Sequence, residues 1–224
     1  MKFLFTTLAI GENYLDDVLG SYILLNKKLE HFNFNITTNI DVKNIEKINF
    51  DVFTMNDYTL QNSFNSNLKV LSLKYALDKN YEFLIYHNSN VKFKNDLTEE
   101  KLITVFEMMR KNDYDVLLNS KSIIEIEKSK DKDSLYFHRL EEYNLFKYRK
   151  WDQSHIIDES FMIFKLNWKF KVFVAKWEQF LWYNIVNNKN STPSGFESGI
   201  SMEEAGINID IMEWKKHIFN CIEY

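Results

Sequence analysis

Hydrophobic positions in the first half of the chain follow two spacings in turn. Short apolar runs indicate strands, and apolar residues three or four positions apart indicate helices. The apolar runs predict strands at 2–8, 32–38, 50–55, 81–86 and 114–119. The helical spacings separate most of these strands, at 14–29, 68–78 and 98–110. Alternation of this kind is typical of an α/β fold, with a mostly parallel central sheet flanked by helices.

Two of these helices carry further signals. Thr98 stands where a side-chain oxygen is expected to accept a backbone hydrogen bond and cap the third helix. In the second helix, Leu71, Tyr75 and Leu77 are expected to face inward. The second helix would then pack against the sheet through this apolar face.

The second half of the chain is more polar and less regular. Alternation at Ile124 and Ile126 suggests an edge strand within 120–133. No repeat and no linker divides the 224 residues, so a single domain is expected. The remaining predictions are a strand at 161–164, an amphipathic helix at 170–186, a loop at 187–199 and a terminal helix at 213–221.

Composition narrows the class of protein. Hydrophobic residues make up 45% of the chain, which is enough for a packed interior. The net charge is −4 and the basic residues are scattered, which argues against nucleic-acid binding because that requires a basic face. The opening apolar run is short and leads straight into acidic residues, so a strand is expected there rather than a signal peptide. No run approaches the length of a membrane span, and we expect a soluble, cytoplasmic protein.

Residue counts exclude several kinds of site. Cys221 is the only cysteine, which rules out a disulfide framework and a cysteine-rich zinc site. The histidines show no metal-ligand spacing. No glycine lies between Gly20 and Gly195, so glycine-rich phosphate loops of the Walker and Rossmann types are absent. Any bound phosphate must be held in another way.

A polar triplet, Asn88-Ser89-Asn90, follows the predicted strand at 81–86. In open α/β sheets, ligands gather at the carboxyl ends of the strands, so the triplet is well placed to bind one. The alternative is a simple turn, because Asn and Ser form turns readily through local hydrogen bonds. The triplet taken alone favours the turn.

The residues around the triplet favour a ligand. A helix, an apolar strand, the triplet and then Val91-Lys92-Phe93 resemble the centre of GT-A glycosyltransferases, in which the triplet is Asp-X-Asp. The bacterial branch of the retaining family 6, the blood-group and α-galactosyl type, carries Asn-X-Asn at this place. The resemblance extends to residues 6–11 and 37–39, after the first two strands, and to Asp158-Glu159-Ser160. The chain departs from the family at Ile157, where a histidine is usual.

The resemblance implies a single GT-A domain, of phage or bacterial type, that moves galactose or N-acetylgalactosamine from a UDP-sugar to a saccharide acceptor with retention. Residues 1–119 would bind the nucleotide sugar, and residues 120–224 the acceptor. Glu159 would act on the reacting sugar, as a nucleophile or by stabilising a positively charged transition state, and Asp158 would bind sugar hydroxyls. The other implied residues are Thr7, Leu8, Tyr14 and Asn39 for uridine and ribose, Asn88, Ser89 and Asn90 for the diphosphate and ribose, and Glu197 for the acceptor.

Aromatic residues upstream of Glu159 offer a further surface for the acceptor. Tyr143, Tyr148 and Trp151 precede His155, and aromatic rings stack well on the C–H faces of sugars. Packing in the core is the alternative role for these side chains.

The Asn triplet also changes the expected chemistry. Two Asp carboxylates would hold a divalent ion, whereas two Asn side chains are poor sole anchors for one. We therefore expect no metal cofactor, and we expect lysines to neutralise the leaving diphosphate. The candidates are Lys74, Lys92, Lys215 and Lys216. Two alternatives remain open: another GT-A enzyme with a different donor or stereochemistry, or an inactive module that binds a nucleotide or saccharide.

Overall fold

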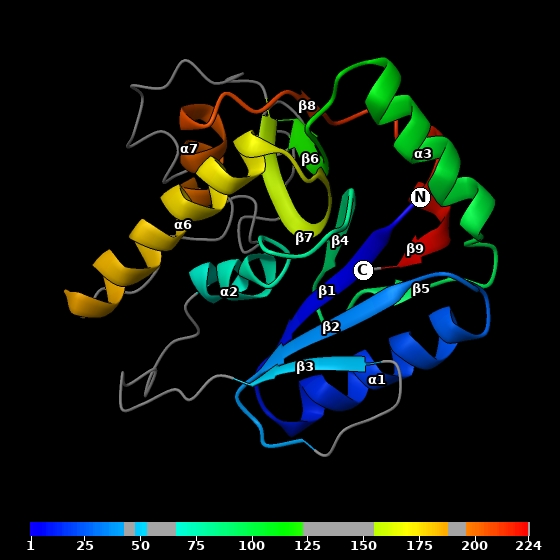
Figure 1. The fold of residues 1–224 in the computed structure, drawn as a ribbon, viewed down its shortest axis with the longest axis horizontal. Coiled ribbons are helices and arrows are strands. Elements are labelled where there is room, and N and C mark those ends of the chain that lie inside the picture. Colours follow the sequence, from blue (N-terminus) through cyan, green and yellow to red (C-terminus); the bar gives the residue numbers. More distant parts are fainter. Residues whose placement is uncertain (43–47, 53–65, 123–154, 188–195, 224) are drawn as a thin grey trace, which may run out of the picture.

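The structure is a computed structural model that describes residues 1–42, 48–52, 66–122, 155–187 and 196–223. Seven strands form one large sheet, and two short strands, β5 (Lys92–Phe93) and β9 (Ile222–Glu223), form a second (Figure 1). The strands of the large sheet are β1 (Phe3–Ala9), β2 (Asn33–Thr38), β3 (Ile48–Val52), β4 (Phe83–His87), β6 (Val116–Ser122), β7 (His155–Lys165) and β8 (Ile209–Asp210).

The large sheet is mostly parallel. Its strand order is β3-β2-β1-β4-β7-β6-β8. β1 pairs in parallel with β2 and β4, β2 with β3, and β6 with β8. Only β7 among these strands runs antiparallel to its neighbours, β4 and β6. The predicted α/β fold with a mostly parallel sheet flanked by helices is confirmed.

Helices cover both faces of this sheet (Figure 1). One face carries α1 (Glu12–Asn26) and α3 (Glu99–Lys111), with α8 (Lys215–Ile218), the 3-10 turn η2 (Phe219–Cys221) and the small sheet beside them. The other face carries the 3-10 turn η1 (Ser66–Leu68), α2 (Lys69–Lys74), α6 (Trp168–Val186) and α7 (Phe196–Glu204).

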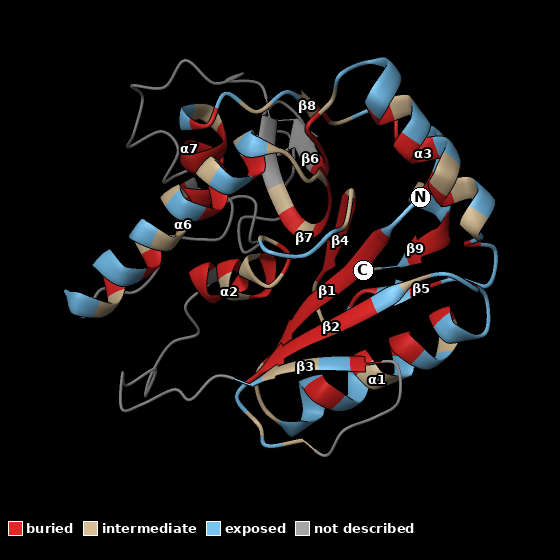
Figure 2. Ribbon diagram, in the orientation of Figure 1, coloured by how far each residue is buried: buried red, intermediate tan, exposed pale blue. Residues whose placement is uncertain are grey.

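Each face has its own hydrophobic core. Along β1, Phe3 and Phe5 pack on the α1 face, whereas Leu4 and Leu8 pack on the α2 face. The central strands are therefore buried on both sides, as Figure 2 shows for β1 and β4. Strands buried on both faces read as continuous apolar runs, which is why the sequence predicts them so clearly.

Individual residues determine where two of the helices begin. Gly11 precedes α1 with a φ of 92°, a conformation that glycine adopts without steric cost, and its amide donates a hydrogen bond to Asn39 Oδ1 at 3.0 Å. Thr98 caps α3, because its side chain accepts a hydrogen bond from the Lys101 amide at 3.3 Å. The predicted cap is thus confirmed, and Gly11 and Asn39 join the carboxyl ends of β1 and β2.

Several predicted boundaries are wrong. α2 ends at Lys74, and it buries Lys69, Val70 and Leu73 rather than the predicted inward residues, which are half-buried. The predicted loop at 187–199 ends early, because Phe196 already begins α7. The predicted strand at 161–164 is the end of the longer β7, and the terminal helix at 213–221 is shortened to α8 and η2.

Part of the second half lies outside the described residues. This part includes the expected edge-strand residues Ile124 and Ile126, and the aromatic residues Tyr143, Tyr148 and Trp151. Within the part that is described, no helix has the length and apolar character needed to cross a bilayer.

Candidate functional site

The carboxyl ends of β1, β2 and β4 meet at one edge of the large sheet. β1 lies between β2 and β4, so the chain builds the sheet first to one side of β1 and then to the other. In open α/β sheets, ligands bind outside the carboxyl ends of the strands at such a reversal of strand order. The Asn88-Ser89-Asn90 triplet follows β4 at this point.

The triplet forms a turn that is tied to β7. The Asn88 amide donates a hydrogen bond to the Ser160 carbonyl at 2.8 Å, and the Val91 amide closes the turn onto the Asn88 carbonyl at 3.1 Å. The Tyr86 hydroxyl donates to Asn88 Oδ1 at 2.9 Å, while Asn90 is exposed. Both interpretations of the triplet therefore fit: it is a turn, and it lies at the edge where a ligand is expected.

A bulge in β7 places the acidic pair beside this turn. Met162 of β7 pairs with Leu118 of β6, but the next residue of β6, Asn119, pairs with Asp158. Residues 159–161 of β7 therefore have no counterpart on β6. A bulge interrupts the regular alternation of side chains and can aim one of them in a new direction.

Asp158 holds this bulge in shape. Its Oδ1 accepts hydrogen bonds from the Ser160 amide at 2.9 Å and from the Ser160 hydroxyl at 2.6 Å. Its Oδ2 accepts from the Asn119 side-chain amide at 3.4 Å. These hydrogen bonds join residues of the bulge to one another and β7 to β6.

Glu159 points toward α2 and α7, where it is almost fully buried, with 1% of the side chain exposed. Its Oε2 accepts a hydrogen bond from Lys69 Nζ at 3.3 Å, and its Oε1 accepts one from the Ser198 hydroxyl. Burial and the nearby Glu159 charge together raise the pKa of the Tyr86 hydroxyl well above its ordinary value, so this hydroxyl stays protonated. The result is a buried carboxylate with a hydrogen-bond donor on each oxygen.

A row of polar side chains lies beneath α2 on the same face of the sheet. Thr6 Oγ1 donates to the Ser72 carbonyl at 3.0 Å. Asn35 Nδ2 donates to Thr6 Oγ1 and to Thr37 Oγ1, each at 3.3 Å. Thr6 and Thr37 belong to the two segments covered by the resemblance, whereas Asn35 was not among the candidate residues, because pairing with other strands decides which face a polar strand residue occupies.

The structure gathers only some of the expected nucleotide-binding residues. Thr7 is fully buried in β1, and within the described residues its hydroxyl has no hydrogen-bond partner. Leu8 is buried in the core on the α2 face. Tyr14 is exposed on α1, and Asn39 binds the Gly11 amide. Thr7, Leu8 and Asn39 therefore lie at the carboxyl edge, and Tyr14 lies on the outer surface of the first helix.

The expected acceptor residues have different positions. Glu197 is not on a flexible loop, as the sequence suggested, but buried within α7, next to Ser198. His155 begins β7, and its side chain is outside the described part of the structure.

The expected lysines lie away from Glu159. Lys74 forms an ion pair with Glu178 of α6 at 2.5 Å. Lys92 is exposed on β5, and Lys215 and Lys216 belong to α8, which packs near α3 on the opposite face. Among the lysines that the structure describes, Lys69 instead reaches Glu159. Lys69 lies between two apolar residues, Leu68 and Val70. These apolar neighbours are the sequence feature that could have indicated that Lys69 is buried.

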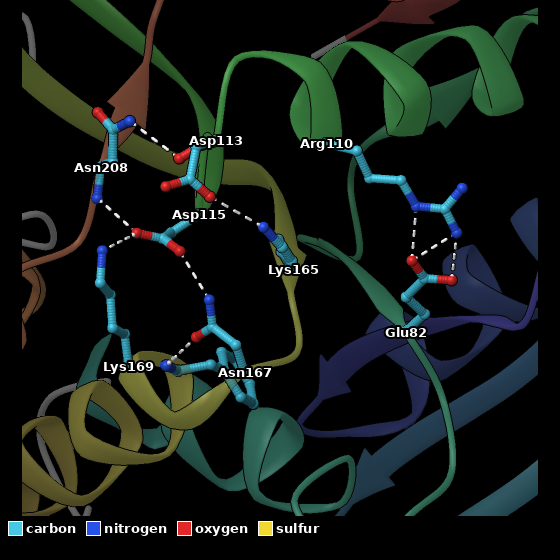
Figure 3. Close-up of polar contacts among 9 residues, drawn as sticks. Glu82, Arg110, Asp113, Asp115, Lys165, Asn167, Lys169 and Asn208 are labelled. Carbon is cyan, nitrogen blue, oxygen red and sulfur yellow. Dashed lines mark hydrogen bonds and ion pairs between the residues drawn. The ribbon is translucent and has the colours of Figure 1, made fainter.

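A second polar network lies at the other end of β7 (Figure 3). Asp115 accepts hydrogen bonds from Asn167 Nδ2 at 2.6 Å, from Lys169 Nζ at 2.7 Å and from the Asn208 amide at 2.9 Å. Burial alone would raise the pKa of Asp115, but the hydrogen bonds, above all that from Lys169, lower it below the usual value. Asp115 and Lys169 thus pair a buried carboxylate with a partly exposed lysine away from the Asn88 turn, and they offer a control for the candidate site.

A surface cavity of about 720 Å³ lies at the amino ends of the strands β1, β2 and β4. It is lined by Met1, Lys2, His31, Phe32, Asn33, Lys79, Asn80, Tyr81 and Glu99. Within the described ranges, no three His, Cys, Asp or Glu side chains are grouped so that they could hold a metal ion.

Comparison with known proteins gives no assignment. The sequence matches no protein-family model, and no curated protein matches it.

Proposed function

We propose that this chain is a metal-independent, retaining hexosyltransferase that moves galactose or N-acetylgalactosamine from a UDP-sugar to a saccharide acceptor. The observation that carries the proposal is the position of Glu159. This buried carboxylate lies on β7 one residue from Ser160, which is bound to the Asn88 turn at the reversal of strand order. The resemblance of the Asn triplet and of Asp158-Glu159-Ser160 to family 6 supports the sugar chemistry.

The carboxyl edge offers groups that suit a nucleotide sugar without a metal ion. Asn88 Oδ1 accepts a hydrogen bond from the Tyr86 hydroxyl, which fixes the orientation of the side-chain amide. The NH2 group of this amide can donate a hydrogen bond, which suits a phosphate oxygen. An Asn side chain also avoids the repulsion that an Asp carboxylate without a metal would exert on a diphosphate. The base and ribose would occupy the adjacent ends of β1 and β2, near Thr7 and Asn39.

The reaction requires charge stabilisation on the sugar. The bond between sugar C1 and the diphosphate oxygen breaks, a bond to the acceptor oxygen forms on the same face, and the acceptor's hydroxyl proton passes to the released UDP. Positive charge develops on the sugar ring as the bond breaks. A fixed carboxylate in a site from which water is excluded stabilises this charge strongly, and we assign that role to Glu159.

The test is release of UDP from UDP-galactose and UDP-N-acetylgalactosamine, with and without saccharide acceptors, in EDTA or in Mn²⁺. We expect turnover that survives EDTA, with the product's anomeric configuration retained by NMR. Glu159→Gln should lower turnover by about 100-fold or more, because the amide keeps the shape of the side chain but not its charge.

Asp115→Asn is the control for Glu159→Gln. Like Glu159→Gln, it removes the charge of a buried carboxylate that is bound to a lysine. It should therefore lower the stability of the fold in a similar way while leaving the residues of the candidate site unchanged. Both variants should be assayed at a temperature at which circular dichroism shows them folded. Full activity of Glu159→Gln, or turnover only with Mn²⁺, would contradict the proposal.

A binding module without activity is the second candidate, and one observation favours it. Both oxygens of Glu159 already accept hydrogen bonds from protein groups. This candidate predicts that UDP binds, as measured by calorimetry, while no UDP is released from any donor.

A further inference from the structure

Lys69 is unusual among the lysines that the structure describes. Its side chain is only 7% exposed, and its ammonium group lies 3.3 Å from Glu159 Oε2. Burial of an ion pair costs desolvation free energy that the attraction within the pair often does not recover, so such a pair is a weak source of stability. A pair of this kind at the candidate site therefore calls for a functional explanation.

The surroundings of the pair come from three separate elements. Lys69 belongs to α2, Glu159 to the bulge of β7, and Ser198 to α7. Ser198 is fully buried and donates its hydroxyl to the second oxygen of the carboxylate. With a donor on each oxygen, the Glu159 side chain is held in one orientation, as a preorganised charge requires.

We infer that Lys69 is a positioning residue for Glu159, which it keeps ionised and fixed at the carboxyl edge of the sheet, with Ser198 as the second support. The inference rests on the proposed function, in which Glu159 stabilises positive charge on the sugar. Lys69 acts through Glu159 and needs no contact with the donor.

The physical basis is the burial of the carboxylate. A buried carboxylate without a cationic partner takes up a proton readily, because a low-dielectric environment disfavours the charged form. The other titratable groups near Glu159 in the described residues are Tyr86 on β4, Asp158 on β7 and Glu197 on α7. None of these is a cation at neutral pH, so among the titratable groups of the described residues Lys69 is the one whose charge favours the charged form, and the hydrogen bond from Ser198 acts in the same direction.

Activity measurements on three variants test the inference. Lys69→Met should reduce UDP release at neutral pH by about tenfold or more, and turnover should fall off at a higher pH than in the parent protein. Lys69→Arg retains the charge and should recover much of the activity, with the acid side of the pH profile near that of the parent. Lys169→Met breaks the ion pair with the buried carboxylate of Asp115 and should leave the profile unchanged.

A role limited to folding would give a different result. Lys69→Met would then lower the thermal midpoint, but the acid side of the pH profile would stay in place and Lys69→Arg would give no specific rescue. That outcome overturns the inference and leaves the proposed function intact.

A second measurement does not depend on activity. Urea unfolding midpoints of Lys69→Met, Glu159→Gln and the double variant form a double-mutant cycle. Lys69→Met alone leaves a buried charge without its partner, whereas the double variant leaves none, so the double variant should be more stable than Lys69→Met. The same comparison serves if Lys69→Met fails to fold: the double variant should fold, and a double variant as unstable as the single would overturn the inference.

The two measurements separate the two claims. If the parent protein releases no UDP while the cycle shows coupling, the proposed function fails and the Lys69–Glu159 pairing stands. If the parent protein is active while the cycle shows no coupling, the positioning role of Lys69 fails alone.

Discussion

His87 illustrates at the residue scale how burial sets the chemistry of a side chain. It ends β4 within an aromatic cluster, with the ring of Phe93 centred 5.0 Å away. Its Nδ1 donates to the Asn88 carbonyl at 2.9 Å, and its Nε2 has no hydrogen-bond partner in the described part of the chain. Burial lowers the pKa of His87 from 6.5 to about 4, although the bond to Asn88 acts in the opposite direction. His87 is therefore neutral in the folded protein at physiological pH.

We expect this histidine to make the stability of the fold depend on pH. Between pH 6.5 and 4 the unfolded chain binds a proton that the folded chain excludes, so the free energy of unfolding should decrease by roughly 3 kcal/mol as the pH falls through this window. Above the window, both states are neutral at His87 and the effect is absent. Urea titrations at about pH 7.5 and about pH 5 cover the upper part of this window and should show a decrease of roughly 2 kcal/mol.

Two variants identify the histidine responsible. His87→Phe keeps a ring in the aromatic cluster but cannot bind a proton, so it should lose most of the pH dependence. His31→Phe is the control, because it replaces a histidine whose side chain is 77% exposed. An unchanged pH dependence in His87→Phe would show that the buried histidine is not its source.

Residue types alone did not indicate which lysine reaches the site. Lys69 and Lys74 lie five positions apart on the same short segment. Of these two, Lys74 was the one predicted to neutralise the leaving diphosphate. In the structure Lys74 binds Glu178 of α6, whereas Lys69 binds Glu159. The helix turns by about 100° per residue, so the two lysines lie roughly 140° apart around its axis, and the choice between them depends on which face of the helix packs against the sheet.

At the scale of elements, α3 shows that the start of a helix can be predicted from neighbouring residues. Its cap, Thr98, was predicted from the sequence, and the structure confirms it. This signal depends only on neighbouring residues and on the free amides at the start of a helix. The bulge of β7 had no such signal, because it is defined by pairing with strands that are distant in sequence.

Thr98→Ala should lower the free energy of unfolding by about 1 kcal/mol, because it leaves the Lys101 amide without its side-chain acceptor. Thr104→Ala is a matched control on the same helix. Its hydroxyl donates back to the Glu100 carbonyl on the exposed side, and alanine has the higher helix propensity. Chemical denaturation of both variants checks the prediction, which fails if Thr98→Ala is no less stable than Thr104→Ala.

At the scale of the whole molecule, Asp115 joins elements that are far apart in sequence. It precedes β6, and its carboxylate binds Asn167 and Lys169 at the start of α6 and the amide of Asn208 before β8 (Figure 3). The pair of Arg110 and Glu82, also in Figure 3, is likewise joined by short hydrogen bonds, but both side chains are exposed to solvent. Exposed ion pairs contribute little, because water screens the charges.

We expect Asp115→Asn to destabilise the protein by roughly 2 kcal/mol and Glu82→Gln by less than about 0.5 kcal/mol. Because the pKa of Asp115 is lowered in the folded state, its contribution is fully present above the unfolded value of 3.8 and is lost as the pH falls through the lowered pKa. Urea titrations at about pH 7 measure both variants. Equal losses for the two would mean that burial does not strengthen the Asp115 network.

The sequence by itself determined the α/β class, the main strands and helices of the first half, and the position of the Asn triplet after β4. These features follow from hydrophobic spacing and from short-range hydrogen bonds, which are properties of neighbouring residues. Only the tertiary structure decided that β7 enters the sheet antiparallel with a bulge, and that Lys69 and Ser198 surround Glu159. The reason is that strand pairing, and the face that a polar residue occupies, depend on contacts between segments far apart in the chain, which no local pattern encodes.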